Sequence, residues 1–458
     1  MTDSQKLQTE RNKLFSDYYN NVIPERMPVQ LSLGYLIVAE IAGLDTVDIQ
    51  FEYSRVSDAA RMIPELVYSD TCPVGIASLA SRIAGGYQMI DSQSFRMGAN
   101  GQMQHPEVIG MLEDEYGELI DDPYACILEK ILPRQHSAFS LDDPVKRSNR
   151  IMMLQAENNR QISATSMIVG ELTEKYGYYK GAPAGSGGFT AAPYDYLGDQ
   201  LRSFSGISTD IRRRRNEIIA ACESLLPLMF NLGLPKNPAP EGIVGMPLHM
   251  PTYMREKDFT EVWLPTYLRL VQQYAARGIR TRPFHEHDWM RYLDIIQDFP
   301  AGTLMAFEYG DPKTIKDKLG KKFLITGLYP INLIKTGTKD QVIDKAKEML
   351  DIMLPGCGYV FGFDKGALML SDLNLDNFKV LSEFLRDHAK FDNAGQSFGM
   401  KVNSEIYAID PDIGYFESKY LTDWDEYKEK YPFTPEYMKD ILHGYDIDVL
   451  RFYLNLLC

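Results

Sequence analysis

The second half of the chain alternates between two hydrophobic patterns. Short apolar runs of strand length recur at residues 242–248, 279–284, 303–307, 323–327 and 358–363. Longer stretches of helical character accompany them, at residues 210–232, 256–277, 290–297, 314–319, 339–354 and 376–388. Strands and helices that alternate in this way predict βα units and a parallel sheet. The number of units indicates an α/β protein with a (β/α)8 TIM barrel, in which functional residues lie at the carboxyl ends of the strands.

The first half of the chain is less regular. Residues 5–20 predict a polar helix, residues 24–33 a first strand and residues 107–119 a helix, whereas residues 181–189 are rich in Gly and Pro. That glycine run lacks the Lys-Ser/Thr of a phosphate-binding loop, which leaves a connector or a loop that covers substrate. We therefore expect a barrel over residues 1–392, enlarged by an insertion at about residues 55–200. A C-terminal extension over residues 393–458 would pack on the barrel or on another copy of the chain in a homodimer.

The composition and net charge of the chain limit the kinds of partner that it is expected to bind. The chain of 458 residues has 45% hydrophobic and 24% charged residues, which is ordinary for a soluble globular protein. Its net charge of −15 argues against binding to nucleic acid or to an anionic membrane surface. That charge also disfavours a strongly acidic substrate, unless a local basic pocket overrides the field. The chain has five scattered cysteines without a CxxC pair, no evident signal peptide and no apolar segment of bilayer length. These features predict a cytoplasmic protein with reduced thiols.

Two of the seven histidines lie one residue apart, in His285-Glu286-His287, at the end of a predicted strand. In an extended chain, residues i and i+2 point to the same side, so the two imidazoles would project together. With the flanking carboxylates they form half of a site for Zn²⁺ or a comparable ion. The alternative is that one histidine caps the next helix and the other is solvated at the surface.

Further polar side chains follow the neighbouring predicted strands. They are His249, Glu308, Tyr329, Asn332, Asp364 and Lys365. On a barrel they would gather at one rim, where two imidazoles and a carboxylate with an open position form a catalytic type of zinc site. His249 could instead cap a helix, and Glu308 could accept a backbone hydrogen bond. Cys357 precedes its strand and would lie at the opposite end of a barrel, so we exclude it as a ligand.

Several segments resemble the uroporphyrinogen decarboxylase superfamily, which comprises the decarboxylase and corrinoid-dependent methyltransferases on a (β/α)8 barrel. They are Pro24-Glu25-Arg26-Met27-Pro28-Val29, Gly327-Leu328-Tyr329-Pro330, Gly358-Tyr359-Val360-Phe361-Gly362 and Leu375-Asp376-Asn377-Phe378. The resemblance covers most of residues 20–55 and 200–392. The decarboxylase carries an Arg-rich motif soon after its first strand, which holds the substrate's carboxylates, whereas residues 30–36 contain no arginine. The resemblance therefore points to the methyltransferase branch.

Methyltransferases of this branch bind zinc through a His-x-Cys after the fifth strand and a Cys after the eighth. Here His287 stands in the place of the first cysteine, and the second falls near Lys365. The metal would then be held by His285, His287 and a carboxylate, Glu308 first and Asp364 second, or no metal is bound. A site of nitrogen and oxygen ligands suits an oxygen leaving group, whereas a thiolate-rich site suits activation of a sulfur nucleophile.

A chain of this length is similar to the first methyltransferases of anaerobic O-demethylase systems. The resemblance implies transfer of a methyl group from a methoxylated aromatic compound to the Co(I) corrinoid of a small partner protein. Zn²⁺ would polarise the ether oxygen or, without a metal, a histidine or tyrosine would protonate it. The residues expected to be catalytic are His249, Tyr329 and Lys365, and those expected to contact substrate are Phe189, Met250 and Asn332. The alternatives are methyl transfer from a corrinoid to a thiol or folate, a decarboxylase-like enzyme, and a barrel that only binds a corrinoid protein.

Overall fold

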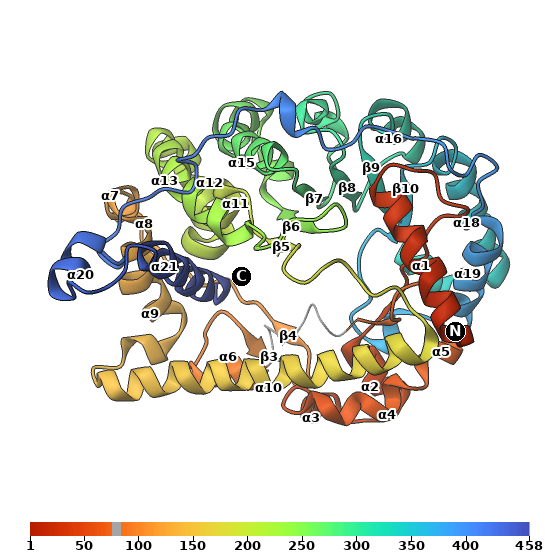
Figure 1. Cartoon of the computed structure of the whole chain (residues 1–458), viewed down its shortest axis with the longest axis horizontal. Helices are drawn as coiled ribbons and strands as arrows, with labels where there is room; N and C mark the ends of the chain where they lie inside the picture. Colours follow the sequence, from red (N-terminus) through yellow and green to blue (C-terminus); the bar gives the residue numbers. More distant parts are fainter. Residues whose placement is uncertain (76–83, 458) are drawn as a thin grey trace.

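A six-stranded parallel sheet organises the second half of the molecule. The computed structural model describes residues 1–75 and 84–457. The strand order is β10-β9-β8-β7-β6-β5, so neighbours in the sheet are also neighbours along the chain (Figure 1). The strands are β5 (Gly188–Phe189), β6 (Ile243–Leu248), β7 (Arg280–His285), β8 (Leu304–Phe307), β9 (Leu324–Tyr329) and β10 (Tyr359–Phe363). The βα units and the parallel sheet predicted from the sequence are confirmed.

Two small sheets lie outside these six strands. Strands β1 (Leu33–Gly34) and β2 (Val74–Gly75) form a parallel pair. Strands β3 (Arg96–Met97) and β4 (Met103–Gln104) form an antiparallel pair. The first half of the chain is otherwise mainly helical.

Helices follow one another around the outside of the six strands (Figure 1). In the second half they include α12 (Phe204–Arg213), α13 (Arg215–Gly233), α15 (Leu264–Ala276), α16 (Pro312–Leu319), α17 (Ile331–Thr336), α18 (Lys339–Met353) and α19 (Leu375–His388). The first half includes α1 (Asp3–Tyr19), α2 (Tyr35–Ile41), α7 (Tyr116–Asp121), α8 (Pro123–Cys126), α9 (Leu132–Gln135), α10 (Pro144–Tyr176) and the π-helical segment η5 (Tyr196–Arg202). The chain closes with α20 (Trp424–Lys430) and α21 (Met438–Asn455).

Alternate residues of the strands enter two different cores. Met305, Phe307, Ile325, Tyr359 and Phe361 belong to the large core beneath the outer helices. Leu304, Leu324 and Val360 pack instead against Phe15, Tyr18 and Tyr19 of α1 in a smaller core. Successive residues of a strand point to opposite faces, so the sheet has a helix face and an α1 face.

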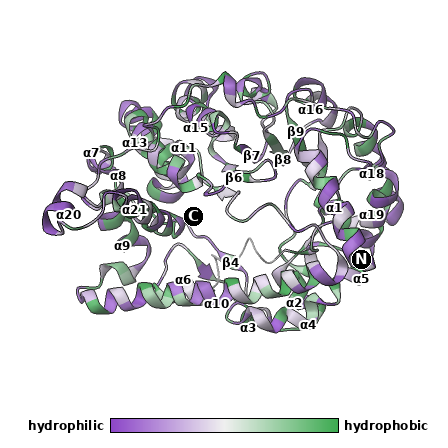
Figure 2. Ribbon diagram, in the orientation of Figure 1, coloured by the Kyte–Doolittle hydropathy of each residue, from purple (hydrophilic) through white to green (hydrophobic). Residues whose placement is uncertain are grey.

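Local capping signals set the ends of the longest helix. Helix α10 begins at Pro144, after Asp143, whose side chain accepts hydrogen bonds from the first free backbone N–H groups. It ends at Tyr176 and is capped by Gly177, which has φ +63° and whose missing Cβ would lie 2.2 Å from the carbonyl oxygen of Ser4. Figure 2 shows hydrophobic and hydrophilic bands alternating along this helix, as expected where one side packs on the protein and the other meets solvent.

Three predictions of local structure are wrong. Residues 107–115 are not helical, because the backbone N–H of Met111 donates to the Leu201 carbonyl across the fold and α7 begins only at Tyr116. Residues 290–297 form two short 3-10 turns, since the side chains of Arg291 and Tyr292 donate to carbonyls of the loop after β6. The strand predicted over residues 24–33 is reduced to a start at Leu33, because the prolines in it cannot donate to a neighbouring strand.

The C-terminal segment packs within the same chain. Helix α21 lies beside α8 and α9 (Figure 1), and the Nε2 of His136 is 3.1 Å from the Leu456 carbonyl oxygen. Leu450, Leu454 and Leu457 are buried. No helix in the described ranges combines the length and the apolar sequence needed to cross a membrane.

Candidate functional site

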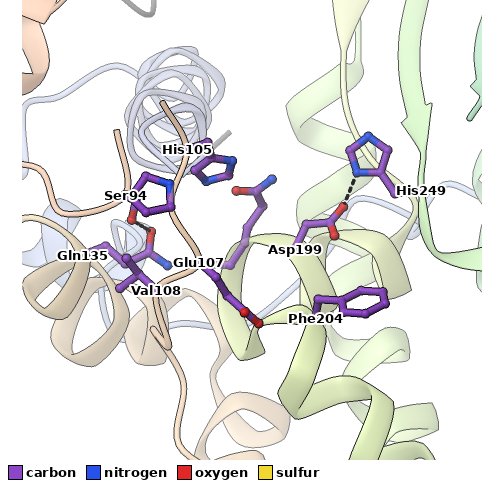
Figure 3. Close-up of a pocket in the computed structure, with 10 residues that line it drawn as sticks. Ser94, His105, Glu107, Val108, Gln135, Asp199, Phe204 and His249 are labelled. Carbon is purple, nitrogen blue, oxygen red and sulfur yellow. Dashed lines mark hydrogen bonds and ion pairs between the residues drawn. The ribbon is translucent and has the colours of Figure 1, made fainter. Parts of the chain in front are cut away.

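Two adjoining cavities lie at the carboxyl ends of β6 and β7. One has a volume of about 260 Å³ and the other about 320 Å³, and both are lined by Asp199, Phe204 and His249. The first is also lined by Ser94, His105, Pro106, Glu107, Val108, Gln135 and Gln200, and the second by Met250, Tyr253, Glu286 and His287. Figure 3 shows Asp199, Phe204 and His249 on one wall of the first cavity and Ser94, Val108 and Gln135 on the other. We call the two cavities together the His249 cleft.

His249 directly follows β6 and lies between two carboxylates. Its Nδ1 is 2.8 Å from Asp199 Oδ2, and its Nε2 is 2.8 Å from Glu286 Oε1. Burial alone would lower the pKa of His249, but the two hydrogen-bonded carboxylates outweigh it and raise the pKa to about 11. The ring is therefore protonated at neutral pH, with each N–H donating to a carboxylate. Since the described lining contains no Lys or Arg, this imidazolium is a main source of positive charge in the cleft.

Asp195 holds the loop that carries His249. Its Oδ1 accepts from the backbone N–H of His249 at 2.7 Å and of Met250 at 3.1 Å, and its Oδ2 accepts from the indole N–H of Trp263. Desolvation, with the nearby charge of Asp199, raises the pKa of Asp195 to about 7. Sequence reasoning missed both aspartates. The available signal was their spacing of four residues in an otherwise apolar helical stretch, which places both carboxylates on one helix face.

Tyr253 and His287 form a second polar pair on the edge of the cleft. The Tyr253 hydroxyl is 2.9 Å from His287 Nε2, and the backbone N–H of His287 donates to Glu308 Oε2 at 2.8 Å. Glu308 also accepts from Lys365 Nζ at 3.2 Å, and these hydrogen bonds outweigh desolvation and lower the pKa of Glu308. The Tyr253 ring meets Phe204 edge-on, with centroids 5.0 Å apart. The cleft thus has an aromatic wall with a hydroxyl and an imidazole at its edge.

His285 lies away from this wall, on the helix face of the sheet. Its side chain is fully buried, stacked on Phe307 at 4.5 Å and edge-on to Trp289 at 4.7 Å. Its Nδ1 is 2.9 Å from the Ala306 carbonyl oxygen, and desolvation lowers the pKa of His285 to about 4, so the ring is neutral. His285 and His287 therefore point apart rather than together, because the strand ends at His285 and His287 has φ +58°.

The other expected rim residues lie outside the cleft lining. Tyr329 is fully buried and donates its hydroxyl to a carbonyl of α18 at 2.9 Å. Asp364 accepts from the backbone N–H at the start of α17 and from that of Lys365. Asn332 is exposed on α17. Of the expected substrate contacts, Met250 lines the cleft.

The expected zinc ligands are not arranged as a metal site. In residues 1–75 and 84–457, no three His, Cys, Asp or Glu side chains are grouped so that they could hold a metal ion. The closest approach is between His287 Nδ1 and Glu308 Oε2, at 3.9 Å, and Glu308 is already paired with Lys365. His285 is turned into the core, and Asp364 is engaged by backbone N–H groups. As they lie, these four side chains do not fit zinc.

Comparison with known proteins assigns no family to the chain. No protein-family model matches the sequence, and no curated protein matches it. The geometry of the His249 cleft and the resemblance of the short motifs are therefore the two indications of function.

Proposed function

We propose that this chain is a corrinoid-dependent methyltransferase that removes the methyl group of a methoxylated aromatic compound. The methyl acceptor would be the Co(I) corrinoid of a small partner protein. One observation carries the proposal: the His249 imidazolium lies at a strand end, beside Phe204 and the hydrogen-bonded pair of Tyr253 and His287. Positive charge, a proton donor and aromatic surface are what an aryl ether needs in order to lose its methyl group.

The chemistry requires stabilisation of a leaving oxygen. When the methyl–oxygen bond breaks, its electron pair remains on a phenolate oxygen, while Co(I) supplies the two electrons of the new cobalt–carbon bond. The Tyr253 hydroxyl, bonded to His287, donates a proton to the leaving oxygen and regains one from solvent. The His249 imidazolium, whose N–H groups are held by Asp199 and Glu286, offsets the negative charge of those carboxylates beside the leaving oxygen. The acceptor can approach from solvent, because the side chains of Tyr253 and His287 are more than half exposed.

The charge of the cleft favours this reaction over decarboxylation of a tetrapyrrole. The lining includes the carboxylates of Glu107, Asp199 and Glu286 and, among the described residues, no Lys or Arg. A substrate with eight carboxylates would meet repulsion at this opening and find no counter-charges there.

The proposal includes a closed (β/α)8 barrel. Strands β1 and β2 form one parallel pair and β5–β10 one parallel sheet, so together they would supply the eight strands of a barrel, with β3 and β4 as a separate hairpin. Helix α1 packs on residues at the amino-terminal ends of β8, β9 and β10, as a plug at the bottom of a barrel would. The His249 cleft lies at the other end, where barrel enzymes carry their active sites.

A single-hydroxyl variant tests the assigned roles. Tyr253→Phe keeps the aromatic wall and removes the proton donor, so we expect the rate of methyl transfer to a reconstituted corrinoid protein to fall about 10²- to 10⁴-fold. Tyr415→Phe, at an exposed position outside the cleft lining, is the matched control and should leave the rate unchanged. An unchanged rate in Tyr253→Phe would remove this residue from the mechanism.

A further inference from the structure

Helix α10 presents a face with little charge to solvent, along one edge of the molecule (Figure 1). Its exposed residues between positions 151 and 170 are Met152, Met153, Ala156, Asn159, Arg160, Ile162, Ser163, Ser166, Met167 and Gly170. Arg160 is the one charged side chain in this set, and its guanidinium is paired with the carboxylates of Glu52 and Glu157. Met152 and Met167 are 67% and 69% exposed. Because the solvent side of a helix ordinarily carries charged residues, this face indicates a contact surface.

The exposed face follows the spacing of a helix that packs along another helix. Positions 145, 149, 152, 156, 159, 163, 166 and 170 are separated by alternating steps of four and three residues, which is the seven-residue repeat of a coiled-coil seam. Three small residues lie seven apart on this seam, namely Ala156, Ser163 and Gly170. Small side chains at the contact let a second helix approach to about 8 Å, the short end of the usual distances between helix axes.

The residues of this face are arranged alike from both ends of the helix. On either side of a point between residues 159 and 160, Met152 corresponds to Met167, and Ala156 corresponds to Ser163. A helix that packs antiparallel on its own copy brings corresponding positions together across a two-fold axis. In that pairing methionine meets methionine and small residues meet small residues, so the face is complementary to itself.

The charges at the two ends of α10 favour the same antiparallel arrangement. The first two turns contain Lys146, Arg147 and Arg150, whereas the last two turns contain Glu171 and Glu174 with a single lysine. This distribution is unfavourable for the helix by itself, because the helix dipole favours acidic residues at the amino end and basic residues at the carboxyl end. In an antiparallel pair, each basic end lies beside the acidic residues and the negative dipole end of the partner helix.

We propose that a second copy of this chain docks on α10, with the two helices packed antiparallel about a two-fold axis beside Asn159 and Arg160. Residues 145–174 form a strip about 45 Å long and about 11 Å wide, or about 500 Å² in each copy. Two copies would bury about 1,000 Å², which is the lower limit for a specific interface, so the dimer should dissociate in the micromolar range. The residues of this face are absent from the described lining of the His249 cleft, so the dimer is independent of the proposed function.

Sedimentation equilibrium of the full chain measures this dimer. We expect wild type to pass from monomer to dimer between about 1 and about 100 µM. Met152→Glu should weaken the dimer by at least about 10-fold, because it places a carboxylate from each copy in the apolar contact. Met400→Glu, the same change at an exposed methionine outside α10, is the matched control and should dimerise as wild type does. Circular dichroism should show the same helix content in all three proteins, which separates loss of the dimer from loss of the fold.

Disulfide formation between copies tests the antiparallel register. In the proposed pairing, the two copies of residue 159 lie beside the axis, whereas the two copies of residue 149 lie about 30 Å apart along the helices. Asn159→Cys should therefore form an intermolecular disulfide under mild oxidation and Asn149→Cys should not, because the bond requires Cα atoms within about 7 Å of each other. A wild type that stays monomeric, a dimer that survives Met152→Glu, or equal cross-linking of the two cysteine variants would overturn the inference.

Discussion

His285→Phe distinguishes a core histidine from a metal ligand. A phenyl ring keeps the stacking on Phe307 and Trp289 and loses the hydrogen bond to Ala306, which costs about 1 kcal/mol at pH 7. The folded-state pKa of His285 is about 4, below the value of 6.5 for the unfolded chain. As pH falls below 6.5, His285 becomes protonated in the unfolded chain but stays neutral in the folded chain. The free energy of unfolding of the wild type therefore decreases until about pH 4. The difference between the two pKa values corresponds to about 3 kcal/mol of stability, at about 1.36 kcal/mol for a difference of one in pKa.

The relative stability of the two proteins should therefore change sign with pH. We expect His285→Phe to be about 1 kcal/mol less stable than wild type at pH 7 and about 2 kcal/mol more stable at pH 4.5. Urea unfolding followed by tryptophan fluorescence measures both, since Trp289 contacts the substituted ring. Phe307→Leu weakens the same packing but keeps the imidazole, so it should follow the pH dependence of wild type. A difference between His285→Phe and wild type that is constant with pH would refute the buried, neutral state of His285.

Three further substitutions probe the fold. Asp70→Asn should lower the free energy of unfolding by about 3–5 kcal/mol, because it leaves Arg11 and Arg26 without the buried carboxylate that both contact; thermal unfolding at pH 7 measures the loss. Because its pKa is raised, His249 stabilises the fold fully below pH 6.5, and this contribution is lost as pH rises toward 11. The loss of unfolding free energy in His249→Gln, measured by urea unfolding, should therefore shrink from pH 6.5 to pH 10, and a loss that is constant with pH would contradict the ion pairs. Gly327→Ala should destabilise the protein by at least about 2 kcal/mol in thermal unfolding, because Gly327 has φ +94° and a Cβ would lie 2.2 Å from a carbonyl oxygen of β8. A change in stability below about 0.5 kcal/mol would contradict the strand geometry.

The sheet was readable from the sequence because its strands are short apolar runs. Val244, Met246 and Leu248 fill the helix face of β6, and the predicted strand at residues 242–248 is confirmed almost to its ends. Residues that directly follow a strand were also found, since parallel strands end at one edge. His249 and His287 both line the cleft for this reason.

The directions in which the side chains point could not be predicted from the sequence. His287 has a left-handed backbone conformation, which turns its side chain away from that of His285. No local sequence pattern predicts that conformation in a residue other than glycine. Asp195 and Asp199 were missed because they contact His249 from 54 and 50 residues away in the chain. Such long-range contacts depend on the packing of whole elements.

Methyl transfer can be followed through the absorbance of a Co(I) corrinoid protein that is incubated with the purified chain and a methoxylated aromatic donor. We expect the Co(I) spectrum to be replaced by that of the methylated corrinoid, with one phenol released for each methyl group transferred. A spectrum that stays unchanged with both methoxybenzoates and methoxybenzenes would contradict methyl transfer from an aryl ether, and transfer from the methylated corrinoid to a thiol or folate would identify the opposite direction.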